Sequence, residues 1–175
     1  MTELLAPVTF RPIGVIRTPF TDTAGMPIQA AAAAGTRGTI ELDPAFADGL
    51  LDLDGFSHLT LLYHLHEIRE PRIVVTPFLD AARHGIFATR SPARPNPIGL
   101  STVRLVAITG TTLEIEDVDM LDGTPLLDLK PYVPAFDDRS GARIGWFAGR
   151  LDRLPDARAD RRFSPGWPGD RSNHR

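Results

Sequence analysis

The sequence predicts a mostly β protein, a closed or nearly closed barrel with only a few short helices or turns. Short runs of apolar and β-branched residues follow one another along most of the chain, and glycine or proline separates them. Residues 112–120 alternate polar and apolar side chains, which is typical of a strand buried on one face. No stretch carries the long apolar stripe of an amphipathic helix. Many short strands with turn signals between them indicate a closed β architecture.

The predicted strands cover residues 10–18, 38–42, 58–66, 72–76, 85–90, 100–109 and 112–120, in chain order. Gly110 and Thr111 separate the last two strands and predict a tight hairpin. Residues 44–50 form the best short helix, and Asp43 before them is a suitable cap. The alanine run at 30–34 fits either one helical turn or a loop, and the sequence does not decide between them.

The length of 175 residues and a hydrophobic content of 42% predict one core, which we expect within residues 1–138. Residues 139–175 are rich in Asp, Arg, Gly and Pro, and apolar residues are few after Leu154. We therefore expect a C-terminal extension that adds little to the core. Its last dozen residues are expected to form a disordered, mobile tail.

Composition excludes several classes of protein. The chain has no cysteine, which rules out disulfides and thiolate metal sites. A formal net charge of −3 argues against a protein that coats nucleic acid by bulk electrostatics, although it allows a local basic patch. The first residues do not resemble a signal peptide, and no apolar run approaches the roughly 20 residues of a membrane span. We expect a cytoplasmic protein with no membrane partner.

The segment of residues 88–101 is the least ordinary in the chain, with the sequence ATRSPARPNPIGLS. Its three prolines fix φ and remove backbone donors, so it can be neither a helix nor a central strand. Arg90 and Arg94 lie on this stiffened loop, and Gly99 permits close backbone approach. A rigid loop with arginines can present charge to a phosphate or a carboxylate, but an ordinary proline-rich connection has the same pattern.

The strand at residues 58–66 places three histidines on one face, which raises the possibility of a metal site. His64, His66 and Glu70 even have the H-x-H-x-x-x-E spacing of a cupin. A cupin needs another histidine on a second glycine-bounded strand, and neither His84 nor His174 has such a context. We therefore expect no metal, and instead imidazoles that pack or hydrogen-bond beside a ligand pocket.

Residues 116–131 gather carboxylates around a turn, in the sequence EDVDMLDGTPLLDLKP. The D-G-T-P run at 122–125 is a strong turn signal. The simplest structural interpretation is a hairpin with a solvated acidic turn. Carboxylates beside a pocket would alternatively attract a cationic ligand such as a sulfonium, or accept hydrogen bonds from ribose hydroxyls and amines.

Together, five segments resemble the TrmO family, a TsaA-like β-barrel domain. The matching segments are residues 13–20 (IGVIRTPF), 27–29 (PIQ), 49–66 (GLLDLDGFSHLTLLYHLH), 85–101 (GIFATRSPARPNPIGLS) and 118–134 (VDMLDGTPLLDLKPYVP). Their order and spacing cover roughly residues 10–136. The resemblance implies a homodimeric methyltransferase on a single TsaA-like β-barrel, which uses S-adenosylmethionine to methylate the exocyclic nitrogen of threonylcarbamoyladenosine beside the tRNA anticodon. The absence of a βαβ unit with a glycine-rich first loop agrees with a cofactor site unlike the Rossmann type.

The resemblance also implies a set of site residues. Those expected to bind the cofactor are Pro27, Ile28, Gln29, His66, Glu67, Arg90, Leu100, Asp117, Val118, Asp119 and Met120. The candidates for the substrate side and for catalysis are Asp119, Asp122, Lys130 and Tyr132, and a carboxylate such as Asp119 or Asp122 would orient the amine and accept its proton. Arg94 and Arg104, together with Arg90, are expected to contact phosphates of the substrate.

Two departures from the family pattern affect the acceptor more than the cofactor. Bacterial members usually have glutamine where this chain has Glu67, and they continue into a second domain that helps to hold tRNA, for which this chain is too short. The same barrel acting on a small molecule or a peptide is therefore one alternative. A non-catalytic RNA-binding barrel and a cupin-like metalloenzyme are the others.

Overall fold

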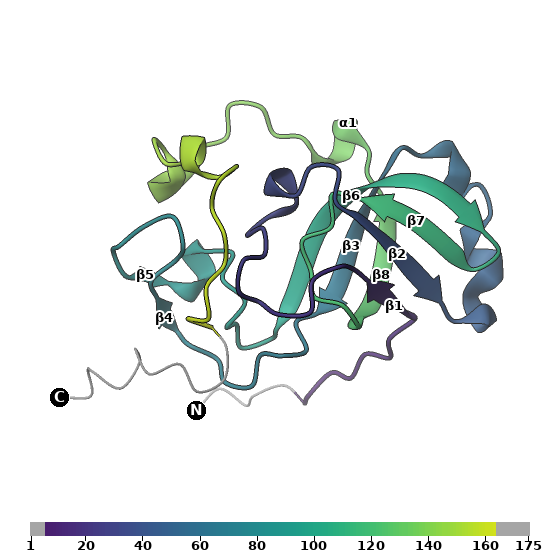
Figure 1. Cartoon of the computed structure of the whole chain (residues 1–175), viewed down its shortest axis with the longest axis horizontal. Coiled ribbons are helices and arrows are strands. Elements are labelled where there is room, and N and C mark those ends of the chain that lie inside the picture. The colour runs from purple at the N-terminus through teal and green to yellow at the C-terminus, as the bar shows by residue number, and fades with distance from the viewer. Residues whose placement is uncertain (1–5, 164–175) are drawn as a thin grey trace.

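The computed structural model describes residues 6–163 and contains one closed antiparallel barrel. Six strands close it in the order β1-β2-β7-β6-β3-β8, and each strand pairs with its two neighbours. The strands are β1 (Gly14–Arg17), β2 (Arg37–Leu42), β3 (His58–His64), β6 (Ile98–Thr109), β7 (Thr112–Glu116) and β8 (Thr124–Pro131). Figure 1 shows this barrel on the right of the molecule. The predicted barrel with few short helices is confirmed.

The interior of the barrel is filled by alternate side chains of its strands, as the period of two requires. Leu59, Leu61 and Tyr63 of β3 point inward, and so do Gly99, Ser101 and Val103 of β6. The buried cluster extends to Ile16, Ile40, Leu42, Leu53, Leu113, Ile115, Val118, Met120 and Leu126. All of its members lie within the predicted domain of residues 1–138.

Several predicted elements keep their position. The turn at Gly110 and Thr111 joins β6 to β7 as an antiparallel hairpin, and Gly110 has a φ of 60°. The short helix η2 (Pro44–Leu50) is a 3₁₀ helix whose cap is Asp43, since the Asp43 carboxylate accepts a hydrogen bond from the Ala45 amide at 2.9 Å. The alanine run forms a single 3₁₀ turn, η1 (Ala30–Ala32).

Two strand predictions and the hairpin interpretation of the acidic turn are wrong. β7 ends at Glu116 because Asp117 takes a left-handed conformation with a φ of 70°, so the strand does not reach residue 120. The predicted strand at 85–90 is instead a residue pair of β5 (His84–Gly85) followed by the 3₁₀ helix η4 (Ile86–Ala88). The acidic turn does not close a hairpin, because β7 pairs with β2 and β6 whereas β8 pairs with β1 and β3.

Beside the barrel lies a second region, which we call the cap lobe: residues 66–94 and 139–163. Its only strands are the short pair β4 (Val74–Val75) and β5. Short turns follow in its C-terminal half, η5 (Gly145–Phe147) and η6 (Leu151–Arg153), after the single-turn helix α1 (Pro134–Asp137) that leaves the barrel. Figure 1 shows the C-terminal part in yellow-green beside β4 and β5.

Arginine side chains hold the two halves of the cap lobe together. Arg153 donates to the Leu79 carbonyl oxygen at 3.4 Å, and the Trp146 indole donates to the Ala88 carbonyl oxygen at 2.7 Å while its ring stacks on His84. Arg150 forms an ion pair with Asp80 at 3.1 Å. The predicted mobile tail falls outside the described residues, and within residues 6–163 no helix is long and apolar enough to cross a membrane.

Candidate functional site

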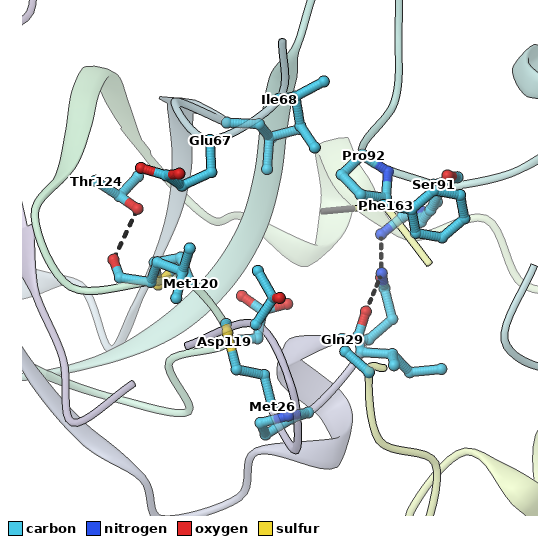
Figure 2. Close-up of a pocket in the computed structure, with 18 of the residues that line it drawn as sticks. Met26, Gln29, Glu67, Ile68, Ser91, Pro92, Asp119, Met120, Thr124 and Phe163 are labelled. Atoms are coloured by element: carbon cyan, nitrogen blue, oxygen red, sulfur yellow. Dashed lines mark hydrogen bonds between the residues drawn. The ribbon is translucent and has the colours of Figure 1, made fainter. Parts of the chain in front are cut away.

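A cavity of about 710 Å³ lies where one end of the barrel meets the cap lobe. Its size is that of a pocket for a drug- or nucleoside-sized ligand. The barrel, the loop at residues 21–29, the proline-rich loop and the C-terminal segment all contribute walls. Figure 2 shows the cavity with Met120 and Thr124 on one side and Ser91, Pro92 and Phe163 on the other.

A chain of hydrogen bonds runs from the barrel interior to the cavity. Ser101 Oγ donates to Asp119 Oδ1 at 2.7 Å and lies 2.9 Å from the Tyr63 hydroxyl. Because the single Ser101 proton goes to the carboxylate, the Tyr63 hydroxyl must donate to Ser101. The chain Tyr63–Ser101–Asp119 therefore fixes the orientation of one carboxylate at the edge of the cavity.

Gly99 is what allows Tyr63 to take part in this chain. A Cβ at residue 99 would lie 2.1 Å from Tyr63 Cε2, so no other residue leaves room for the ring. The two residues are paired in register across β3 and β6. The sequence predicts a close approach to the Gly99 backbone, and the group that approaches it is the Tyr63 ring.

Burial raises the pKa of Asp119 to about 6, although hydrogen bonds from Ser101 and from backbone amides lower it in part. The more distant positive charge of Arg90 also acts in the lowering direction. The carboxylate forms no ion pair within residues 6–163. A desolvated carboxylate of this kind is available for a cationic or proton-bearing ligand.

The two arginines of the proline-rich loop have different positions. Arg94 anchors the loop, and Arg90 lies on the cavity lining. Arg94 Nη1 donates to the carbonyl oxygens of Ile86, at 3.2 Å, and Thr89, at 2.9 Å, which locks the loop against η4. Arg90 is exposed, and its Nη1 donates to Gln29 Oε1 at 3.1 Å, across the cavity rim. Ser91 Oγ is buried on the wall and finds no partner among the described residues.

The residues that follow β3 form a further part of the cavity lining. His66 Nε2 lies 3.7 Å from Glu67 Oε1, and both residues line the cavity with Ile68. Within residues 6–163, no three His, Asp or Glu side chains come close enough together to hold a metal ion.

The structure brings most of the predicted cofactor residues together on this cavity. Those that line it are Pro27, Ile28, Gln29, His66, Glu67, Arg90, Leu100, Asp119 and Met120, and Arg94 of the predicted substrate residues lines it as well. Asp117 and Val118 do not. The Asp117 carboxylate accepts from the Gly35 amide at 2.7 Å, and Val118 is packed in the barrel core.

Four other predicted residues lie away from the cavity on the barrel surface or its rim. Asp122 accepts a hydrogen bond from the Thr18 amide at 3.1 Å, Lys130 pairs with Asp128 at 2.7 Å, and Tyr132 Oη donates to Asp138 at 2.5 Å. Arg104 forms an ion pair with Glu116. Their substrate or catalytic roles stay predictions.

Two further features of the site were not singled out from the sequence: a serine behind the cavity wall and a C-terminal stretch on the wall itself. Ser101, which orients Asp119, occupies an inward position of β6 between Gly99 and Val103, and a serine among inward-facing positions is a signal that a polar partner lies inside. The C-terminal stretch of residues 159–163 also lines the cavity, and its charged composition gave no such signal.

Comparisons with known proteins agree on one family. The model of the tRNA-methyltransferase O N-terminal domain matches residues 15–138. A "Probable S-adenosyl-L-methionine-binding protein" of Pyrococcus abyssi is 52% identical over 156 residues, which are 89% of this chain and 85% of that protein. The tRNA (adenine(37)-N6)-methyltransferase of Escherichia coli is 37% identical over 71% of this chain and 57% of that protein.

Solved structures give the same result. A crystal structure of TrmO from Pseudomonas aeruginosa superposes with a TM-score of 0.68 at 39% identity. The match covers 81% of this chain but only 63% of that one. The chain thus corresponds to less than two thirds of the solved protein.

Proposed function

The chain belongs to the family of the tRNA-methyltransferase O N-terminal domain, and from this premise we propose that it is an S-adenosylmethionine-dependent methyltransferase acting on an adenosine of tRNA. The observation that carries the proposal is the cavity between barrel and cap lobe, with the half-buried Asp119 carboxylate on its wall. The proposal is supported by the names of two relatives, a probable S-adenosyl-L-methionine-binding protein and a tRNA (adenine(37)-N6)-methyltransferase.

The residues present fit such a cofactor. Asp119 is a carboxylate without an ion-pair partner in the described part of the chain, and it suits the positive charge of a sulfonium or an ammonium group. Ser91 Oγ is a buried hydroxyl with an unmet hydrogen bond, which suits a polar group of a ligand. Met26, Ile68 and Phe78 provide apolar surface for a purine ring.

The predicted cofactor residues that line the cavity have distinct tasks in this proposal. Gln29 and Arg90 join the loop at 21–29 to the proline-rich loop and so fix the width of the cavity. Pro27, Ile28, Leu100 and Met120 enclose the ligand, and His66 and Glu67 close the end of β3. When bound, the cofactor supplies an electrophilic methyl group, while the protein supplies position and electrostatics.

With the cofactor bound, its methyl group would pass from sulfur to the acceptor nitrogen, and the protein would have to position that nitrogen and take up the proton that it loses. Asp119 is the group placed to accept that proton, because it is the desolvated carboxylate on the wall. Tyr63 and Ser101 hold its orientation. Holding the acceptor in line with the methyl group is worth about 7–11 kcal/mol of the barrier in well-oriented reactions.

The acceptor in this proposal is the exocyclic nitrogen of threonylcarbamoyladenosine beside the anticodon. The proposal includes a cytoplasmic location, where a tRNA substrate is found, and a homodimer, as the family resemblance implies. The cap lobe carries twelve arginines and six carboxylates, and this excess of positive charge suits a phosphate backbone.

Mass spectrometry of tRNA nucleosides from a strain that lacks the gene tests the acceptor. We expect the methylated nucleoside to disappear, and to return when the gene is restored but not when Asp119→Asn replaces it. Isothermal titration with S-adenosylmethionine tests the cofactor separately. Saturable binding with an unchanged tRNA profile would point to a small-molecule or peptide acceptor instead.

A further inference from the structure

One wall of the cavity is formed by residues that the family model does not match. That match ends at residue 138, yet Ala159, Asp160, Arg161 and Phe163 line the cavity. We call residues 155–163 the closing segment. It is the last described part of the cap lobe, and it lies along the loop that contains Met26 and Pro27.

Backbone hydrogen bonds fix the closing segment beside that loop. The Gly25 amide donates to the Ala159 carbonyl oxygen at 2.8 Å, and the Ala159 amide donates to the Met26 carbonyl oxygen at 2.8 Å. Pro27 and Arg158 form an isolated antiparallel bridge. The segment is therefore ordered next to two residues of the cofactor cavity.

Arg162 anchors the closing segment on its other side. Its Nη1 donates to the carbonyl oxygens of Thr76, at 3.3 Å, and Pro77, at 3.1 Å. The guanidinium also binds both carboxylate oxygens of Asp160, which lowers the Asp160 pKa, and lies over the Phe78 ring at 4.8 Å. These contacts tie the segment to the first half of the cap lobe through a half-buried cation.

The anchor sets the position of an aromatic pair on the wall. Phe163 packs edge-on against Phe78 with ring centroids 5.3 Å apart, and both rings line the cavity. Arg72 donates to the Arg162 carbonyl oxygen at 2.5 Å and approaches the Phe163 ring at 5.9 Å. In Figure 2, Phe163 lies on the side of Ser91 and Pro92, away from Thr124 and Met120.

We infer that the closing segment is part of the cofactor site, in which Phe163 and Phe78 form the wall for the purine nucleoside and Arg162 is a positioning residue that holds this wall. The inference rests on the proposed function. Aromatic rings suit a nucleobase because every base presents a π-face. The charged end of the ligand then lies toward Asp119, so the apolar and the anionic walls fix its direction.

The test is isothermal titration of S-adenosylmethionine and S-adenosylhomocysteine into the full chain and three variants. Phe163→Ala and Arg162→Ala are expected to weaken both affinities about tenfold or more. Arg139→Ala is the matched control, because its side chain lies outside the closing segment and the cavity lining, is exposed, and donates to the Asp138 carbonyl oxygen at 2.7 Å. Its affinity is expected to stay within twofold of the wild type.

Hydrogen exchange provides a second measurement that does not depend on a variant. In the wild-type protein, the amides of residues 159–163 are expected to exchange more slowly when S-adenosylhomocysteine is bound. Unchanged exchange together with unchanged affinity in Phe163→Ala would overturn the inference and leave the proposed function standing. An effect on the KM for tRNA alone would also overturn it, since the wall would then serve the acceptor. Wild-type protein that binds neither nucleoside would overturn the proposed function itself.

Discussion

The barrel and the cap lobe differ in how they are held together. The barrel has six paired strands around a continuous apolar cluster, and that cluster includes no residue of the cap lobe. The cap lobe has one two-residue ladder and is held largely by guanidinium groups that donate to backbone carbonyls. A regular sheet satisfies its own backbone, whereas irregular chain needs side chains to do so.

The same two regions differ in charge. The cap lobe carries twelve basic and six acidic side chains, while the rest of the described chain carries five basic and 14 acidic ones. The net charge of −3 hides this division. The cavity therefore lies between an acidic barrel and a basic, less regular lobe, and in the proposed function the lobe is the side that would meet the tRNA.

The largest effect on stability is expected from the barrel core. Leu61→Ala removes a fully buried side chain and should lower the free energy of unfolding by about 2–5 kcal/mol. Leu79→Ala makes the same change in the cap lobe, where fewer apolar groups surround the site, and should cost less. Denaturant titration of both variants measures the difference. Equal losses would contradict the expectation that Leu79 is packed less extensively than Leu61.

The next largest effect is expected from Asp119, where the two regions meet. Asp119→Asn should lower kcat about 100-fold, which is in the usual range for loss of a general base. In the wild type, kcat/KM should fall as the pH drops below about 6, because the carboxylate of the free enzyme becomes protonated. The variant should lose this dependence, and an unchanged acidic limb would contradict the assignment.

Ionisation of Asp119 should affect stability and activity in opposite directions: activity rises as the carboxylate ionises, whereas the stability of the folded protein falls. The folded-state pKa of Asp119 is raised from 3.8 to about 6, so the folded protein loses stability as the pH rises between these values. Asp119→Asn removes that loss. We therefore expect the Tm of the variant, relative to the wild type, to increase from pH 4 to pH 7.

A smaller effect is expected from the anchor of the proline-rich loop. Arg94→Lys cannot hold the two carbonyl oxygens of Ile86 and Thr89 with one planar group. Affinity for the cofactor should fall severalfold, and amide exchange should rise in residues 86–94 while the strands of the barrel keep their protection. Increased exchange throughout the barrel would show that the loop supports the whole fold.

The smallest effect is expected at Lys130, which is exposed on β8 and pairs only with Asp128 among the described residues. Surface pairs of this kind contribute roughly 0–1 kcal/mol. Lys130→Ala should leave the affinity for S-adenosylmethionine within twofold of the wild type. A raised KM for tRNA with that affinity unchanged would support the substrate role predicted from the sequence.

Much of the barrel could be predicted because its signals are local. Alternating side chains indicated β7 and the buried face of β3, and the turn at Gly110 indicated the hairpin. β8 was missed because carboxylates surround its start and Pro125 lies within it, a pattern that favours a turn. The strand pairs with β1 and β3, which are distant in sequence, so no local pattern could reveal its partners.

The sequence by itself determined the fold class, the family and most of the lining of the cavity, because long motifs such as FATRSPARPNPIG carry positions that few other sequences share. Only the tertiary structure decided which carboxylate faces the cavity. Asp117, Asp119 and Asp122 are near neighbours in the chain, but Asp117 accepts from the Gly35 amide, Asp119 lies half-buried beside Ser101, and Asp122 accepts from the Thr18 amide. The left-handed backbone at Asp117 and the closure of the barrel separate their side chains, and desolvation then acts most strongly on Asp119. The closing segment, likewise, joins the site only because the chain returns from the cap lobe to the loop at residues 25–27.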